Sequence, residues 1–194
     1  VLANISEYYP VEKGAFFFGV MATISWAEIF AIDCGLFVEI SDESSIIIIG
    51  GFRLNISSSV DKLLSLNVLF SAQVIFSEGF YLDASLVDSS IVGITLYGDV
   101  IMRILWGGAT KGFMLSPGGF HPSYTPEPGF KVPKMDKIGM KMDYKVLVLN
   151  LESYFAFTSN TVQFGSSLTL DLDWTVCQLK GGTEFNALFQ FNPF

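Results

Sequence analysis

The chain has 194 residues, of which 51% are hydrophobic and 15% are charged, and its net charge is −8. Its mean hydropathy of +0.48 is higher than that of an ordinary soluble domain, and 19 residues are phenylalanine. There are 11 basic and 19 acidic residues with no basic cluster. This balance excludes a nucleic-acid-binding protein, because phosphate binding needs a concentrated positive surface.

Hydrophobic and polar residues alternate along most of the chain, which is the pattern of strands with one apolar face. In chain order, the alternation predicts strands over residues 15–26, 29–40, 46–56, 64–77, 92–106, 134–157 and 162–176. A short helix over 58–66 is the one alternative, but its second half fits the following strand better. No run reaches the roughly 18 apolar residues of a transmembrane helix.

About ten such segments follow one another, and many are longer than an ordinary strand. The breaks between them carry turn residues, in SDESS (41–45), SEG (77–79), DSS (88–90) and KGG (180–182). Short breaks between long strands favour an antiparallel meander. We therefore expect one all-β domain over residues 1–194, curled into a half-pipe or a closed barrel with one continuous apolar face. The chain starts at Val1 without methionine, so we expect a fragment of a longer protein.

The sequence offers no amphipathic helix to cover the apolar face. The face could line a closed barrel, lie outside a barrel in a bilayer, or form an open trough filled by lipid or by more sheet. We expect it to meet hydrophobic cargo through nine large residues: Phe16, Phe18, Trp26, Phe70, Leu96, Trp106, Phe164, Leu170 and Trp174.

Residues 115–133 form the one long irregular connection, rich in proline and glycine, and they contain the only histidine, His121. A single histidine without a nucleophile or a second metal ligand does not indicate catalysis. We expect His121 to be a corner residue that pairs with backbone groups, and the loop to cap one end of the apolar trough. Contacts with a neighbour are expected from Phe120, His121, Tyr124, Asn160 and Gln163.

Other residues add no catalytic, metal or cofactor site. Asn160 and Gln163 lie in the segment TSNTVQFG, which suits a turn at a strand start; a sugar or headgroup contact is the alternative. Cys34 falls among apolar positions and Cys177 among polar ones, so no disulfide is expected. We expect no metal and no cofactor.

Three blocks appear in order along the chain: GGFHP (118–122), TSNTVQFG (158–165) and FNALFQF (185–191). Together they resemble a family of unknown function, DUF6603, which is associated with very large, mostly bacterial β-rich proteins. In the last block Asn186 stands where the family pattern usually has Asp. The resemblance implies an internal domain of a long β protein, and it implies no reaction.

Two functions follow from these observations. The first is a non-enzymatic module whose apolar face shelters lipid or another hydrophobic ligand within a longer protein. The second is a structural or interaction module of a surface or secreted assembly, with its core filled by its own aromatic residues and with the parent chain or neighbouring copies as partners. An outer-membrane-type barrel is a further alternative, and the sequence assigns no compartment.

Overall fold

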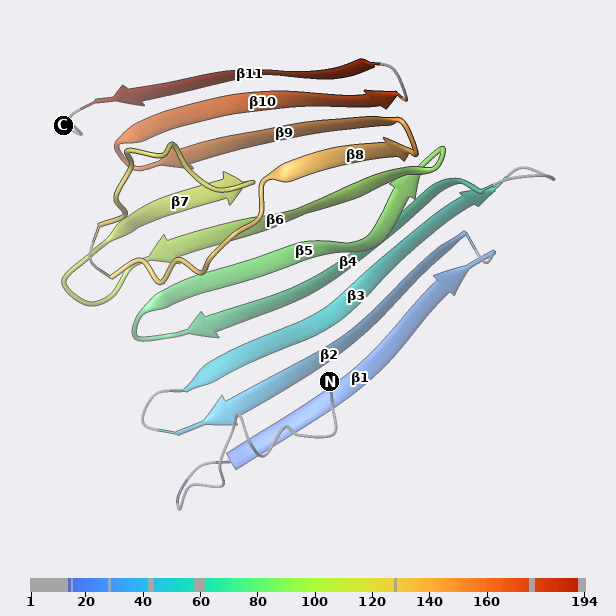
Figure 1. The fold of residues 1–194 in the computed structure, drawn as a ribbon. Helices are drawn as coiled ribbons and strands as arrows, with labels where there is room; N and C mark the ends of the chain where they lie inside the picture. Colours follow the sequence, from blue (N-terminus) through green and yellow to red (C-terminus); the bar gives the residue numbers. More distant parts are fainter. Residues whose placement is uncertain are drawn as a thin grey trace.

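The computed structural model describes residues 14, 16–27, 29–41, 44–57, 62–127, 129–174 and 177–191 (Figure 1). None of these residues forms a helix, so none belongs to a helix long and apolar enough to cross a membrane. The strands are β1 (Phe16–Trp26), β2 (Phe30–Ile40), β3 (Ser45–Ser57), β4 (Lys62–Ile75), β5 (Gly79–Ile91), β6 (Ile94–Leu105), β7 (Gly112–Pro117), β8 (Ile138–Tyr144), β9 (Leu147–Thr158), β10 (Thr161–Trp174) and β11 (Cys177–Gln190).

All eleven strands belong to one antiparallel sheet, and the expected meander is confirmed. The strands follow chain order across the sheet, from β1 at one edge to β11 at the other. Because β1 and β11 are edges and do not pair with each other, the sheet is open and the closed-barrel alternative is wrong. The strand direction turns gradually from β1 to β11 (Figure 1), as the right-handed twist of strands requires.

Strands β7 and β8 share one position in the sheet. β7 pairs with one half of β6, from Val100 to Leu105, and β8 pairs with the other half through Thr95, Leu96 and Tyr97. Both also pair with β9 on their other side. The chain thus leaves the sheet after β7, runs through residues 118–137, and returns to the same position as β8. We call residues 118–137 the strap.

The register places the long hydrophobic rows of the strands on one side of the sheet, and only isolated apolar pairs, such as Phe37 with Ile47, lie on the other side. Partners across successive strands include Leu36 with Ile48, Phe70 with Ala84, and Leu168 with Leu151. We call this side, which carries Phe16, Leu36, Phe70, Leu96 and Leu170, the apolar face. We call the other side, which carries Asp33, Arg53, Asp99, Arg103 and Gln163, the polar face.

Several expected boundaries are wrong. The segment 88–90 is not a turn: β5 continues to Ile91 through a one-residue bulge next to Asp88, whose φ is 45°. The turn follows at Val92 and Gly93, both with positive φ. The segment 180–182 lies inside β11, paired with residues 169–171 of β10. Lys62 already belongs to β4, so the described part of the 58–66 helix is a strand; residues 58–61 lie outside the described residues.

Most of the buried side chains lie on the polar face, which the alternation alone does not predict. Of the buried hydrophobic residues, Ala72 alone lies on the apolar face. The others are Phe37, Ile47, Tyr81, Ile101, Leu105, Met114, Tyr154 and Ala156, all on the polar face. The strap covers several of them, and the apolar face has no such cover among the described residues.

Glycines on the sheet stand directly opposite aromatic residues of the next strand. On the polar face the pairs are Gly19 with Phe37, Gly139 with Tyr97, and Gly165 with Tyr154. In each pair the aromatic ring lies where a glycine Cβ would be. The ring therefore shields the bare glycine backbone and packs flat on the sheet, an arrangement known to rescue glycine in strands.

The Gly165–Tyr154 pair predicts that Gly165→Ala destabilises the fold. A methyl group at Gly165 overlaps the Tyr154 ring, which must move, and such overpacking costs about 1–3 kcal/mol. Gly182 on β11 is the matched control, because it lies on the same face and a Cβ there meets its nearest atom at 3.4 Å. Urea unfolding should show a loss of stability for Gly165→Ala and none for Gly182→Ala. Equal effects of the two changes would show that the ring does not occupy this space.

Candidate functional site

The apolar face is the largest candidate surface. At paired positions it carries no Asp, Glu, Lys, Arg, His, Asn or Gln on any of the eleven strands. The charged strand residues with a register partner all lie on the polar face. Such complete separation of charge leaves the apolar face without a charged or amide group for a polar partner at the paired positions.

The structure places eight of the nine expected cargo residues on this face: Phe16, Phe18, Trp26, Phe70, Leu96, Phe164, Leu170 and Trp174. Aromatic residues near the two edges are the most open, with Phe16 74%, Trp26 69% and Trp174 61% exposed. The ninth, Trp106, lies beyond the end of β6, and its Nε1 donates a hydrogen bond to the Phe76 carbonyl. Trp106 therefore stabilises a strand connection.

The strap lies across the polar face, so the expectation that it caps the apolar trough is wrong. Arg103, 3% exposed, holds its middle: Nε donates to the Lys131 carbonyl at 3.0 Å. The same guanidinium donates to the Leu82 carbonyl and to Asp83 Oδ1, each at 2.7 Å. A buried guanidinium needs all these partners, because an unpaired buried charge is very costly.

Asp99 fixes both ends of the strap. Its carbonyl accepts the Gly118 N–H at 2.7 Å where the strap leaves, and its Oδ2 accepts the Asp136 N–H at 2.6 Å where the strap returns. Its Oδ1 accepts the Ser85 hydroxyl. The expected loop over 115–133 is accordingly shifted: residues 115–117 belong to β7, and the irregular segment continues to residue 137.

Gln163 holds the start of the strap. It is fully buried, its Oε1 accepts the His121 backbone N–H at 2.9 Å, and its Nε2 donates to Thr161 Oγ1. The His121 ring accepts the Ser123 N–H through Nδ1, so His121 is a corner residue paired with backbone. Both amide atoms of Gln163 are hydrogen-bonded within the chain. This favours the interpretation of TSNTVQFG as a turn over a contact of Gln163 with a sugar or headgroup.

The other residues expected to meet a partner also hold the strap. Phe120 stacks on Tyr124 with ring centroids 5.2 Å apart. The pKa of Tyr124 is raised, mainly by burial. The hydrogen bond with Thr158 acts in the opposite direction but is the smaller effect. Asn160 Nδ2 donates to Glu127 Oε1 at 3.0 Å. These contacts tie the strap to the turn between β9 and β10.

Glu78 and Lys131 form an outer clasp between the strap and the β4–β5 turn. Lys131 Nζ lies 3.3 Å from Glu78 Oε2 and 5.4 Å from the Tyr81 ring centroid. The Tyr81 hydroxyl donates to the same carboxylate at 3.0 Å. These hydrogen bonds, that of Tyr81 first, lower the pKa of Glu78, while burial raises the pKa of Tyr81.

The described residues offer no cluster of three His, Cys, Asp or Glu that could hold a metal ion. Cys34 and Cys177 are both free. Cys177 pairs with Trp174 and so lies on the apolar face, contrary to its expected polar position. The expectation counted one strand through residue 176, whereas β10 ends at Trp174 and a new strand begins at Cys177.

Comparison with known proteins identifies the family of the chain. A model described as a family of unknown function, DUF6603, matches residues 1–194. The chain belongs to this family. No curated protein and no solved structure matches this DUF6603 chain.

The three DUF6603 blocks meet at one corner of the polar face. GGFHP (118–122) starts the strap, TSNTVQFG (158–165) supplies Gln163 beneath it, and FNALFQF (185–191) lies on β11. Asn186 Oδ1 accepts the Tyr154 hydroxyl at 2.9 Å, and Asn186 Nδ2 donates to Glu184. The Asn186 amide thus donates a hydrogen bond to a neighbouring carboxylate, which an ionised aspartate at this position could not do. The signature residues build the corner that fixes the strap.

Asp99 and Arg103, the main anchors of the strap, were not singled out from the sequence. Ser116, whose hydroxyl donates to the Gly119 carbonyl at 2.6 Å, was also missed. A signal for them exists in the sequence. Ile101, Met114 and Ala156 are apolar residues at polar-face positions, and each is almost fully buried. Apolar residues at these positions indicate the part of the polar face that another segment covers.

The anchors predict different effects for two neighbouring changes. Gln163→Ala removes the acceptor for the His121 N–H and should cost about 1–3 kcal/mol. His121→Ala keeps that backbone donor and should leave the strap in place. Limited trypsin digestion at Lys131 and Lys134 reports strap release, because both are exposed strap residues. Release by His121→Ala as fast as by Gln163→Ala would contradict the anchoring role of Gln163.

The clasp predicts a pH-dependent part of the stability. Glu78 has a lower pKa in the folded chain than its ordinary 4.5, so its contribution is complete above that value and is lost as pH falls through the folded value. Urea unfolding of native and Glu78→Gln protein at several pH values measures it. The stability difference between the two should shrink with acidification. A difference that stays constant through this range would show that the clasp does not titrate.

Proposed function

We propose that this chain is a non-enzymatic β platform that binds lipid acyl chains on its apolar face. One observation carries the proposal: the apolar face crosses the whole sheet without a charged or amide side chain at a paired position, and it has no cover among the described residues. No residue is assigned to catalysis, and the net charge of −8 gives nucleic acid no binding surface.

The size of the face requires a partner of some kind. Monomeric soluble proteins rarely expose a contiguous apolar patch larger than a few hundred Å². Burying one large apolar side chain contributes about 1.5–3 kcal/mol, and residues such as Phe18, Leu179 and Phe185 are more than half exposed. The energy available from covering the face is therefore large compared with the stability of a domain.

Acyl chains suit the face better than a protein surface does. Protein interfaces have a polar rim and roughly ten hydrogen bonds. The serine hydroxyls on the apolar face are used within the sheet: Ser153 donates to Ser166, Ser166 to the Glu152 carbonyl, and Ser89 to backbone. These serines offer few free hydrogen-bonding groups to a polar partner, whereas a hydrocarbon partner needs no hydrogen bonds.

A second sheet packed on the apolar face is the alternative occupant, since two sheets can stack about 10 Å apart with interdigitating side chains. This arrangement makes the chain a structural module of a larger assembly. It is supported by the same apolar residues, so the experiment must separate the two occupants.

The test is extraction of the purified chain followed by mass spectrometry of bound lipid, together with co-sedimentation on phosphatidylcholine vesicles. Leu170→Lys puts a charge on the apolar face and should abolish lipid recovery and vesicle binding. Thr169→Lys is the matched control, because the adjacent residue points to the polar face and is exposed. Lipid-free protein that forms stable dimers, sensitive to Leu170→Lys, would overturn the proposal in favour of sheet packing.

A further inference from the structure

The outer edge of β1 is an open edge of the sheet. β1 pairs with β2 along its whole length, and no described strand lies on its other side. Every residue of β1 is exposed. An open strand edge offers backbone N–H and C=O groups with which a strand of another chain can pair. This edge is distinct from the apolar face, so a partner bound here leaves that face uncovered.

β1 carries none of the features that protect an edge strand from pairing. Natural edges are kept apart by charged side chains, above all lysine, by proline or by bulges. The strand FFFGVMATISW includes no charged residue and no proline, and its pairing with β2 contains no bulge. The opposite edge differs, because β11 carries Lys180 and Glu184 on its polar face. Of the two edges, β1 is therefore the one suited to pairing.

The sequence of β1 is self-complementary about Met21. When two β1 strands pair antiparallel and centred on Met21, each residue meets the one equally far from Met21 in the other copy. The apolar-face pairs are then Phe18 with Ile24 and Val20 with Ala22, and the polar-face pair is Gly19 with Thr23. Partners always come from the same face, because side chains alternate with a period of two. No charged group enters either face at the junction.

This pairing continues the sheet. A two-fold axis perpendicular to the sheet at Met21 turns one copy into the other. The rotation reverses the strand direction, as an antiparallel pair requires, and leaves both apolar faces on the same side. Two-fold dimers, in which one surface patch meets its own copy, are the commonest assemblies of identical chains. The same register places the exposed Phe16 of one copy opposite the exposed Trp26 of the other.

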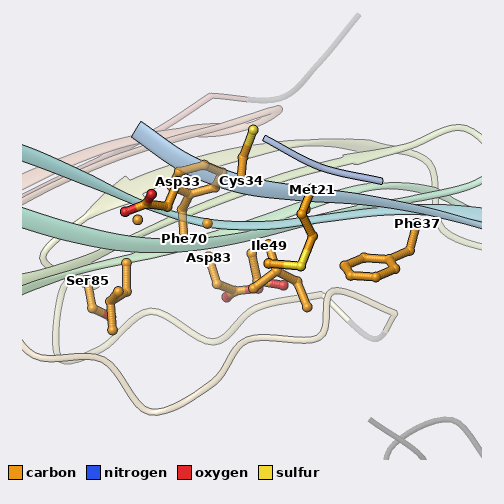
Figure 2. A pocket seen from close by; sticks show the side chains of 13 residues that line it. Met21, Asp33, Cys34, Phe37, Ile49, Phe70, Asp83 and Ser85 are labelled. Atoms are coloured by element: carbon orange, nitrogen blue, oxygen red, sulfur yellow. The ribbon is translucent and has the colours of Figure 1, made fainter. Parts of the chain in front are cut away.

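Met21 lies at the centre of this junction. Its side chain is 64% exposed and lies beside the Phe37 ring, and both lie over Gly35 on the polar face (Figure 2). The two-fold axis brings the Met21 side chains of both copies together, and methionine adapts readily to such a contact. Asp33, opposite Thr23 on β2, is ion-paired with Arg53 at 2.7 Å. It therefore adds no unneutralised charge beside the junction.

We propose that two copies of this chain pair edge to edge through β1, with a two-fold axis at Met21, into one continuous sheet. The backbone ladder between the two β1 strands holds the copies together, and the side-chain pairs around Met21 set the register. The apolar faces of both copies lie on one side of the joined sheet and stay open. The pairing is therefore independent of what covers the apolar face.

Sedimentation velocity of the full chain, in a mild detergent that covers the apolar face, measures the pairing. Native protein should be dimeric at micromolar concentrations. Met21→Lys and Met21→Glu each place like charges face to face at the axis and should raise the dissociation constant roughly tenfold or more. An equimolar mixture of the two variants places opposite charges there and should restore dimers, which misfolded variants would not do. Monomeric native protein, or a mixture that stays monomeric, would overturn the proposal.

Two lysine variants elsewhere control for the added charge. Gln178 is exposed on the polar face of β11, the opposite edge strand, so Gln178→Lys should leave the dimer intact. Leu170→Lys, on the apolar face, should also leave it intact. Dimers that are lost in Leu170→Lys and kept in Met21→Lys would indicate packing of two sheets face to face, and would overturn edge pairing.

Cross-linking tests the register without a charge, and it also serves if a charge at position 21 prevents folding. In Met21→Cys the two introduced thiols lie on directly opposite residues, within the Cα separation of about 4.4–6.8 Å that a disulfide bridges. In Thr23→Cys, on the same face, they lie about 13 Å apart along the strands. Mild oxidation should give a covalent dimer for Met21→Cys, and for Thr23→Cys only the background of the free Cys34 and Cys177. Equal cross-linking of the two variants would contradict the axis at Met21.

Discussion

The fold depends on a register in which every strand keeps its charged residues on the same side. Because side chains alternate with a period of two, a slip of one residue in any strand would place its carboxylates and lysines among the hydrophobic rows. The bulge in β5 illustrates the constraint. The extra residue beside Asp88 shifts the following positions, so Ser89 and Ile91 enter the apolar rows in place of Asp88 and Ser90. The bulge thus preserves the apolar face where the sequence alternation breaks.

This register gives the two faces different roles in stability. The polar face supplies the packed interior, because the strap covers Ile101, Met114 and Ala156 and is held by Arg103 and Gln163. Buried polar groups with defined partners specify one arrangement, since each unpaired atom would be costly. The apolar face has no comparable directional contacts. Its strands are held by their ladders, and its rows of Leu, Ile, Val and Phe can adapt to whatever covers them.

Much of the sheet could be predicted from the sequence, since alternation in segments such as 29–40 and 64–77 directly gives strand positions and faces. The three sequence blocks also identified the family of the chain correctly. Turn residues were less informative: DSS (88–90) lies at a bulge within β5 and KGG (180–182) lies within β11, because glycine and serine also occur inside strands. The open edges and the path of the strap could not be predicted. Both depend on contacts between distant segments, such as Asp99 with Asp136, that leave no periodic signal.

The location of the family blocks bears on the choice of occupant for the apolar face. GGFHP, TSNTVQFG and FNALFQF meet at the polar-face corner, where specific atoms must pair: Gln163 with His121, and Tyr154 with Asn186. A partner protein seated on the apolar face would require a comparable set of positioned groups there, because specificity between proteins comes from shape and from paired polar atoms. The apolar face provides a large surface area without such groups. Hydrocarbon chains, which are fluid and carry no directional bonds, need only a large apolar area. We therefore propose them as the occupant in preference to a second protein sheet.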